Sequence, residues 1–372
     1  MGQRTSKTLQ SRHFMQGMSL PEILAAVLIG LIGMIVIMQV YVTSEERKRT
    51  LTGTSDAQIN GNIALFTIES AMRSAGFGMV APNSNMLGCT TLAYQSTRPV
   101  PDFNFLMAPV VITVGAAGAP DRITVAYGDS PNIVESEAFV GAAASGADFA
   151  LKSAAGIVLG DLVVASETGL DCSMAEVTGF LPAAINTVQH GDAVAYSYVD
   201  NVGNTISPTA TQNKGGGSGV NYSSNALLFT LGRSPTVVTY QIGSDKLQTR
   251  TLIPYLAAQD SDGDGTTDAD IGDGIVQLKA QYGKDTDGDA VVDTWNTTLP
   301  ANATQWMQVR AVRIALLARS AKLEKTAVAA AAPTWYGGAF TMTNPADGTD
   351  WRFYRYRVFE TVVPLRNMIW SN

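Results

Sequence analysis

Cysteine and histidine are scarce in this 372-residue chain. There are two of each, Cys89 and Cys172, and His13 and His190. The cysteines form no CxxC pair, which excludes a four-thiolate zinc site and a thioredoxin-type redox motif. One disulfide, favoured if this part of the chain is exported, and two buried thiols are the alternatives. A catalytic triad or an HExxH zinc site would depend on His190, which lies in a loop-like segment, so we do not expect an enzyme.

Charged residues are also few, at 15% of the chain, and acidic ones predominate. The net charge is −7, and without Arg4, Lys7 and Arg12 near the N-terminus 22 basic side chains face 32 acidic ones, a net charge of −10. Such a charge repels a polyanion, and no basic patch with interleaved aromatic residues offsets it. We therefore expect no direct nucleic-acid partner.

One long apolar stretch is present, Ile23–Val42, in which Gln39 is the only strongly polar side chain. A helix of this length spans roughly 30 Å at about 1.5 Å per residue, the thickness of a bilayer core. A buried core helix is the alternative. Basic residues precede the span, so the positive-inside rule predicts a cytoplasmic N-terminus, although the mixed charges of residues 45–49 weaken this prediction.

The order of these segments differs from that of an ordinary secretory signal, whose apolar core precedes its cleavage site. Here a basic leader, residues 1–17, comes first, so a cut after Gly17 would leave the apolar segment on the mature chain. Glu22 lies at the start of the span, where a carboxylate is costly unless it is paired, protonated or at the interface. We interpret it either as a helix cap, favoured by the helix dipole, or as a charge that pairs with the amino group of a neighbouring subunit's Met18.

The stretch GMSLPE at residues 17–22, with the basic leader before it and the apolar run behind it, resembles the class III signal of type IV prepilins. The resemblance implies that a prepilin peptidase cuts between Gly17 and Met18 and that Met18 is then N-methylated. It also implies a role for Glu22 in subunit recruitment and register within the filament. Met18 stands where the family usually has phenylalanine.

A second helical pattern occupies residues 43–76. Two apolar faces recur at helical spacing, one with Ile59, Ile63 and Phe66, the other with Leu65, Ile68 and Met72. Gly76 is suited to the C′ position that ends a helix. We expect one helix from residue 18 to residue 76, with residues 18–42 in the membrane or the filament core and residues 43–76 packed on a head.

Residues 77–372 are rich in strand patterns punctuated by glycine, proline and aspartate. The predicted strands are 110–114, 122–127, 162–166, 193–198, 226–230, 237–242, 308–317 and 351–363. Residues 138–154 are predicted as a loop or a weak helix. A glycine-rich loop at 213–219 lacks the GK[ST] ending of a phosphate loop, and we expect the head to divide into two subdomains near 211–220. The predicted fold class is α+β, with a long N-terminal helix packed on a β-rich globular head.

Three later segments resemble PilW-like minor pilins of the type IV pilus: IVQLKAQYG at 275–283, QVRAVRIALLARS at 308–320 and YRVFETVVPLRN at 356–367. The resemblance implies a pilin-like fold and a role in the initiation or tip complex of the pilus, in support of adhesion and twitching motility. The implied partners are other major and minor pilins, the prepilin peptidase, the inner-membrane assembly platform and a tip adhesin. The implied location is the inner membrane, with a periplasmic head, before assembly and the pilus at the cell surface afterwards.

Two alternatives remain. A type II secretion pseudopilin would have the same N-terminal signal. A membrane-anchored β-rich binding module or hydrolase belongs to a different class, and the many acidic residues are compatible with a carboxylate-pair hydrolase.

Two acidic loops have the spacing of calcium ligands. Their carboxylates are Asp260, Asp262, Asp264 and Asp268 in the first loop, and Asp285, Asp287, Asp289 and Asp293 in the second. Neither loop has an acidic residue at position 12, and Ala290 replaces the glycine of position 6 in the second. Weak Ca²⁺ binding by each loop, one site shared by both, and solvated acidic turns are the alternatives; no other cofactor is expected.

Overall fold

The computed structural model describes residues 19–79, 86–132, 136–181, 184–200 and 202–369. The predicted cleavage site, Gly17 and Met18, lies outside these residues. The chain divides into two compact units, Met1–Gly53 and Thr54–Asn372, which are described separately.

The main element of the first unit is the N-terminal part of a 55-residue helix, α1 (Leu20–Ser74). Within it, Leu20–Glu45 has a mean hydropathy of 2.8 and none of it is buried. It is the one helix of the described residues that is long and apolar enough to cross a membrane. So large an exposed apolar surface is unfavourable in water, which favours a lipid or a packed-helix environment for this part of α1.

In the second unit, one face of α1 is buried in the head. The side chains of Ala64, Ile68 and Met72 are fully buried. Gly61 lies so close to the neighbouring strand that a Cβ atom there would come within 2.2 Å of the Phe359 ring. Small residues on this face therefore let the helix approach its neighbours closely.

The other predicted face of this part of α1 is exposed. Ile59, Ile63 and Phe66 keep 54%, 48% and 70% of their surface accessible. The helix ends at Ser74, and Gly76, the predicted C′ residue, has a φ of +78° and donates a hydrogen bond to the carbonyl of Ala126. Far along the chain, the side chain of Asn367 donates to the carbonyls of Ser74 and Ala75, so the C-terminus caps α1.

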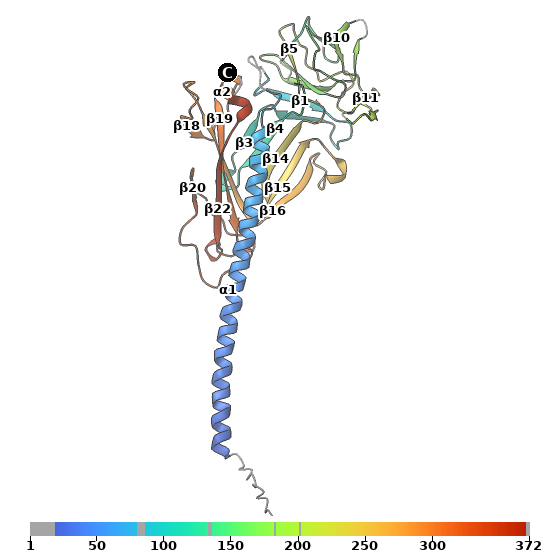
Figure 1. Ribbon diagram of the computed structural model, residues 1–372. Coiled ribbons are helices and arrows are strands. Elements are labelled where there is room, and N and C mark those ends of the chain that lie inside the picture. Colours follow the sequence, from blue (N-terminus) through green and yellow to red (C-terminus); the bar gives the residue numbers. More distant parts are fainter. Residues whose placement is uncertain (1–18, 80–85, 133–135, 182–183, 201, 370–372) are drawn as a thin grey trace, which may run out of the picture. The chain divides into compact units, whose positions relative to one another are not determined.

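Two antiparallel sheets contact this part of α1, beside which their strands are seen in Figure 1. The five-stranded sheet has the order β16-β15-β14-β4-β3. Its strands are β3 (Val110–Thr113), β4 (Arg122–Tyr127), β14 (Thr236–Gly243), β15 (Lys246–Ile253) and β16 (Thr267–Asp273). The four-stranded sheet has the order β18-β17-β19-β22. Its strands are β17 (Ile275–Lys284), β18 (Thr294–Asn296), β19 (Val309–Arg319) and β22 (Tyr356–Pro364).

The central strand β19 is covered on both faces. Val312, Ile314 and Leu316 join the main core with α1, whereas Ala315 and Leu317 pack with Phe340 on the opposite face. This alternation follows the two-residue period of a strand. It explains why residues 314–318 of this strand form an unbroken apolar run.

A six-stranded sheet has the order β2-β1-β8-β7-β13-β5. Its strands are β1 (Thr90–Tyr94), β2 (Asp102–Leu106), β5 (Glu137–Ala138), β7 (Leu162–Ser166), β8 (Cys172–Glu176) and β13 (Leu227–Thr230). The strands β1 and β8 are parallel, with Thr91 opposite Cys172. Cys89 and Cys172 form a disulfide bond at this junction, with their Cα atoms 5.8 Å apart.

Short elements complete the fold. The remaining strands are β6 (Phe149–Ala150), β9 (Gly179–Leu181), β10 (Ala184–Gln189), β11 (Tyr198–Val199), β12 (Thr205–Ile206), β20 (Thr334–Trp335) and β21 (Gly338–Ala339). The short helices are α2 (Ala303–Met307) and α3 (Arg366–Ile369), with 3-10 turns η1 (Ala116–Gly118), η2 (Ala257–Gln259) and η3 (Trp351–Phe353).

Some predictions about the head are wrong. Residues 193–197 form a turn and one isolated bridge, because Ala193 has a φ of +51°, which breaks an extended strand, and only Tyr198 of the predicted segment belongs to a strand, β11. The last long strand begins at Tyr356 rather than Trp351, since residues 351–353 form η3. Of the two alternatives for residues 138–154, the structure has the loop and no helix, with the short strand β6 inside the segment.

The head is also not divided at residues 211–220. The strand β13 follows this loop and pairs with β7, which precedes it, and β14 likewise pairs with β4. Strand pairing therefore joins the two predicted subdomains.

The burial of one face of α1 leads to a matched pair of variants. We expect Ile68→Ala, at a fully buried position, to lower the free energy of unfolding by about 2–5 kcal/mol, through lost burial and a cavity. Ile63→Ala, on the exposed face of the same helix, is expected to change it by about 0.5 kcal/mol or less. Urea unfolding of the full chain in a mild detergent, followed by tryptophan fluorescence, measures both. Equal losses would contradict the assignment of the buried face.

Candidate functional site

The first candidate site is the N-terminus of α1. Glu22 lies in the first turn, and its carboxylate accepts hydrogen bonds from the backbone N–H and the hydroxyl of Ser19, at 3.0 and 3.1 Å. This is the carboxylate half of a capping box, in which a side chain three residues into a helix satisfies an unpaired backbone donor. The helix-cap interpretation thus describes Glu22 within a single chain. A partner's amino group would have to replace the hydrogen bonds from Ser19.

The second candidate site is the first acidic loop, between β15 and β16. Asp260 accepts hydrogen bonds from the backbone N–H groups of Gly263 and Gly265, at 2.7 and 3.0 Å, and from the hydroxyl of Tyr255. Desolvation raises the pKa of Asp260, but these hydrogen bonds outweigh it, so the net effect is a lowered pKa. One carboxylate oxygen from each of Asp260, Asp262 and Asp264 lies within 4.8 Å of the others. This spacing suits a cation.

Arginine side chains already occupy the surroundings of this loop. The guanidinium of Arg250 forms ion pairs with Asp262 and Asp264, and its Nε lies 3.7 Å from Asp268. Arg98 is 5% exposed, stacks over the ring of Phe103 and donates to the carbonyl of Gly265. A metal ion at this loop would therefore compete with the guanidinium of Arg250 for the carboxylates.

The second acidic loop, between β17 and β18, repeats the hydrogen bonds of the first. Asp285 accepts from the backbone N–H groups of Gly288 and Ala290, at 2.7 and 3.1 Å, as Asp260 does in its own loop. Ala290 has the left-handed φ of +67° that Gly265 supplies in the first loop. The turn therefore forms although Ala290 replaces the glycine of position 6.

The charges around the second loop are arranged differently. Asp285 is buried and forms an ion pair with the buried Arg310, at 3.1 Å. Asp287 and Asp289 are exposed, and no lysine or arginine of the described part of the chain pairs with them. Asp293 accepts hydrogen bonds from the backbone N–H and the hydroxyl of Thr286.

The ligand-like oxygens of Asp285, Asp287 and Asp289 again lie within 4.8 Å of one another. They form a cluster separate from that of the first loop, so the loops do not form one shared site.

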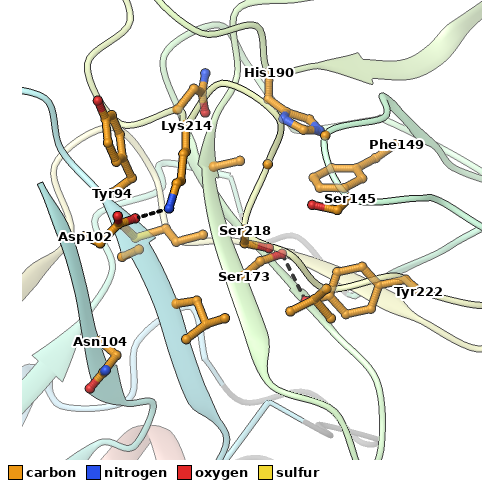
Figure 2. A pocket seen from close by; sticks show the side chains of 18 of the residues that line it. Tyr94, Asp102, Asn104, Ser145, Phe149, Ser173, His190, Lys214, Ser218 and Tyr222 are labelled. Atoms are coloured by element: carbon orange, nitrogen blue, oxygen red, sulfur yellow. Dashed lines mark hydrogen bonds and ion pairs between the residues drawn. The ribbon is translucent and has the colours of Figure 1, made fainter.

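The third candidate site is a pocket of about 210 Å³, shown in Figure 2. It is lined by β1, β2, β8, residues 144–149, His190 and the loop 213–222. The His190 ring stacks on Phe149 with centroids 4.3 Å apart, and its Nε2 contacts the carbonyl of Ala147 at 2.9 Å. The one histidine of the described residues is thus part of the pocket wall and is hydrogen-bonded to backbone.

Sequence reasoning missed the arginines and the pocket. Arg310 lies 25 residues from Asp285 in the sequence and Arg98 lies 167 residues from Gly265, whereas Arg250 lies on the strand just before its own loop. Nothing in the local sequence around these arginines indicates their contacts. The predicted loop 213–219 is present, and Figure 2 shows Lys214 reaching Asp102 across the pocket. Lys214 lies in a loop and Asp102 on β2, so only the tertiary structure brings these two residues together.

A comparison with protein families matches residues 239–367 to the family described as Type IV Pilus-assembly protein W, PilW. The C-terminal region of this chain is PilW-like. The PilW-like region contains both acidic loops and the strands β15–β19 and β22, whereas every residue that lines the pocket precedes it. The match supports involvement in type IV pilus assembly and association with its machinery, and the apolar part of α1 indicates membrane anchoring at the cell envelope. Neither the curated proteins nor the solved structures gave a match.

The two loops lead to different expectations for calcium. We expect Ca²⁺ to raise the Tm of the full chain mainly through the second loop, because Arg250 already pairs with Asp262 and Asp264 in the first loop. A ligand at ten times its Kd stabilises by about 1.4 kcal/mol. Asp289→Asn is expected to remove most of the shift and Asp262→Asn little of it, as measured by differential scanning fluorimetry with Ca²⁺ at millimolar concentrations. No shift in the unaltered chain would leave the loops as acidic turns.

The buried Asp285–Arg310 pair leads to a second prediction. We expect Asp285→Asn to lower the Tm by several degrees, because it removes the charged partner of a buried guanidinium. Asp287→Asn, exposed in the same loop, serves as the control. Equal Tm values for the two variants would contradict the role of the pair.

The same pair has a pH dependence. Desolvation raises the pKa of Asp285, but hydrogen bonds from Gly288, Arg310 and Ala290 lower it overall. Its stabilising contribution is therefore present above the pKa of the unfolded chain, about 4, and is lost as the pH falls through the lower folded value. The difference in Tm between the unaltered chain and Asp285→Asn should shrink in that acidic range.

Proposed function

We propose that this chain is a minor pilin of a type IV pilus that takes part in the initiation or tip complex. The observation that carries the proposal is the continuous helix α1 in a chain with a PilW-like region. Its N-terminal part is apolar and exposed, and its C-terminal part is built into the core of the head. A helix of this kind suits anchoring in a membrane and later packing among the helices of other pilins.

In this proposal the prepilin peptidase cuts after Gly17, and Met18 becomes the methylated N-terminus. Glu22 then pairs with the N-terminus of a neighbouring subunit and sets the register of the helices. The exposed face with Ile59, Ile63 and Phe66 supplies a further apolar contact area for neighbouring subunits. The inner-membrane platform and a tip adhesin complete the set of partners.

The size of the head supports a low-copy position. Unit Thr54–Asn372 would be a bulky repeat for a filament shaft. Pilus-dependent adhesion and twitching motility are then indirect results of assembly, and the chain acts without catalysis.

The assembly role of Glu22 is tested by Glu22→Gln, which keeps the shape of the side chain but removes its charge. We expect normal membrane insertion and processing but roughly ten- to hundred-fold less incorporation into sheared pili, because a charge-assisted hydrogen bond contributes about 1.5–3 kcal/mol. Ser19→Ala is the matched control, since it loosens the cap but keeps the carboxylate. Incorporation is measured by immunoblotting, and mass spectrometry of the mature N-terminus checks for methylated Met18.

Wild-type incorporation of Glu22→Gln would contradict the proposed pairing. A deletion strain distinguishes the pilin from a type II secretion pseudopilin. Loss of surface pili with intact secretion of exoproteins supports the proposal, and the opposite pattern contradicts it.

A further inference from the structure

The pocket near Lys214 lies outside the PilW-like region and has no part in the assembly role proposed above. Its walls come from the six-stranded sheet and from two loops, 144–149 and 213–222. Its volume of about 210 Å³ is below the roughly 300–1,000 Å³ of pockets for drug-sized ligands, so its occupant is small.

The glycine-rich loop over the pocket is held in place at several points. The side chain of Asn213 is buried and bonds to both the N–H and the carbonyl of Glu176, at 2.7 and 2.8 Å. The hydroxyl of Ser145 donates to the carbonyl of Gly216 and accepts from the N–H of Gly219. The pocket is therefore formed before any ligand binds, which lowers the entropic cost of binding.

Two glycines allow this loop to approach the opposite wall. A Cβ atom at Gly217 would lie 2.2 Å from the backbone nitrogen of Gly146, so no larger residue fits there without moving the backbone. Gly217 also has a φ of +78°, which other residues rarely adopt. The close contact between Gly146 and Gly217 fixes the width of the pocket.

The lining combines aromatic rings with polar groups at the rim. The buried ring of Tyr222 forms part of the wall. Its hydroxyl is hydrogen-bonded to the hydroxyl of Ser173 and to the carbonyls of Ala165 and Asp171. Tyr94 is a partly exposed ring of the lining. The side chains of Asn104 and Ser218 form no hydrogen bond to another residue in the described part of the chain. Donors and acceptors are thus available to a ligand beside apolar ring surface.

The charges of the rim cancel. Lys214 and Asp102 are the lysine and carboxylate of the lining, and they pair with each other at 2.7 Å while remaining exposed. A phosphate or another anion would find one neutralised cation and a nearby carboxylate. A neutral ligand that both donates and accepts hydrogen bonds suits this rim better.

A sugar ring has this chemistry, since its C–H faces are apolar and its hydroxyl edge donates and accepts. We propose that the pocket binds one neutral sugar residue. One face of the sugar ring would pack against an aromatic ring of the lining, and its hydroxyls would form hydrogen bonds with Asp102, Asn104, Lys214 and Ser218. The binding does not depend on the pilus role and can be measured on the isolated chain.

The test uses the full chain in a zwitterionic detergent without a sugar headgroup. Binding is detected by saturation-transfer difference NMR, and the Kd of each sugar is measured by titration. The sugars are glucose, galactose, mannose and N-acetylglucosamine. We expect at least one of them to bind with a Kd in the millimolar range. Lys214→Met and Asn104→Ala should each weaken binding about three- to ten-fold, the effect of losing one hydrogen bond.

Lys246→Met is the matched control. Lys246 is also an exposed lysine in an ion pair with an aspartate, at 2.8 Å, but lies on β15, outside the pocket. This variant should bind sugar as the unaltered chain does, and equal Tm values for all variants would show that the fold is kept. The proposal is overturned if no sugar binds at about 100 mM, roughly a hundred times a Kd of 1 mM. It is also overturned if the two pocket variants weaken binding no more than the control does.

Discussion

The fold of the head depends on the burial of one face of α1 between two sheets. Ala64 lies near Gly272 of β16, and Gly61 lies against Phe359 of β22, so small residues set how closely the helix and strands approach. The helix is completed from the far end of the chain, since Asn367 caps its last carbonyls. The PilW-like region therefore forms one core with a helix that lies outside it in sequence.

The two acidic loops show how the same local pattern is used in different surroundings. In each loop the first aspartate accepts hydrogen bonds from the backbone N–H groups three and five residues later in the sequence. The spacing of the aspartates encodes this turn locally. The cations that face the carboxylates come from elsewhere, Arg250 from β15 and Arg310 from β19. Arg250 pairs with carboxylates at the surface of the first loop, whereas Arg310 pairs with a buried carboxylate of the second. The two loops therefore differ in their capacity to bind a metal ion.

The pocket and the assembly helix use separate parts of the molecule. The helix presents its apolar surface along residues 20–45 and again at Ile59, Ile63 and Phe66. The pocket is built where the parallel pair β1–β8 lies beside two glycine-containing loops. The disulfide between Cys89 and Cys172 joins the start of β1 to β8 and so holds the sheet that forms one wall. A ligand could thus be bound without altering the surface proposed for filament contacts.

The sequence alone determined the features that depend on local chemistry. The helix runs from Leu20 to Ser74 with its stop at Gly76, the strands 122–127 and 162–166 have their predicted bounds, and the acidic loops form turns. Tertiary structure decided which face of α1 is buried, how strands pair across residues 211–220, and which arginine meets which aspartate. It also gave β16 its extended form, although three of the seven residues of its sequence TDADIGD are aspartate, because pairing with β15 supplies the hydrogen bonds. Local propensity is set by neighbouring residues, whereas these outcomes depend on contacts between residues far apart in the chain.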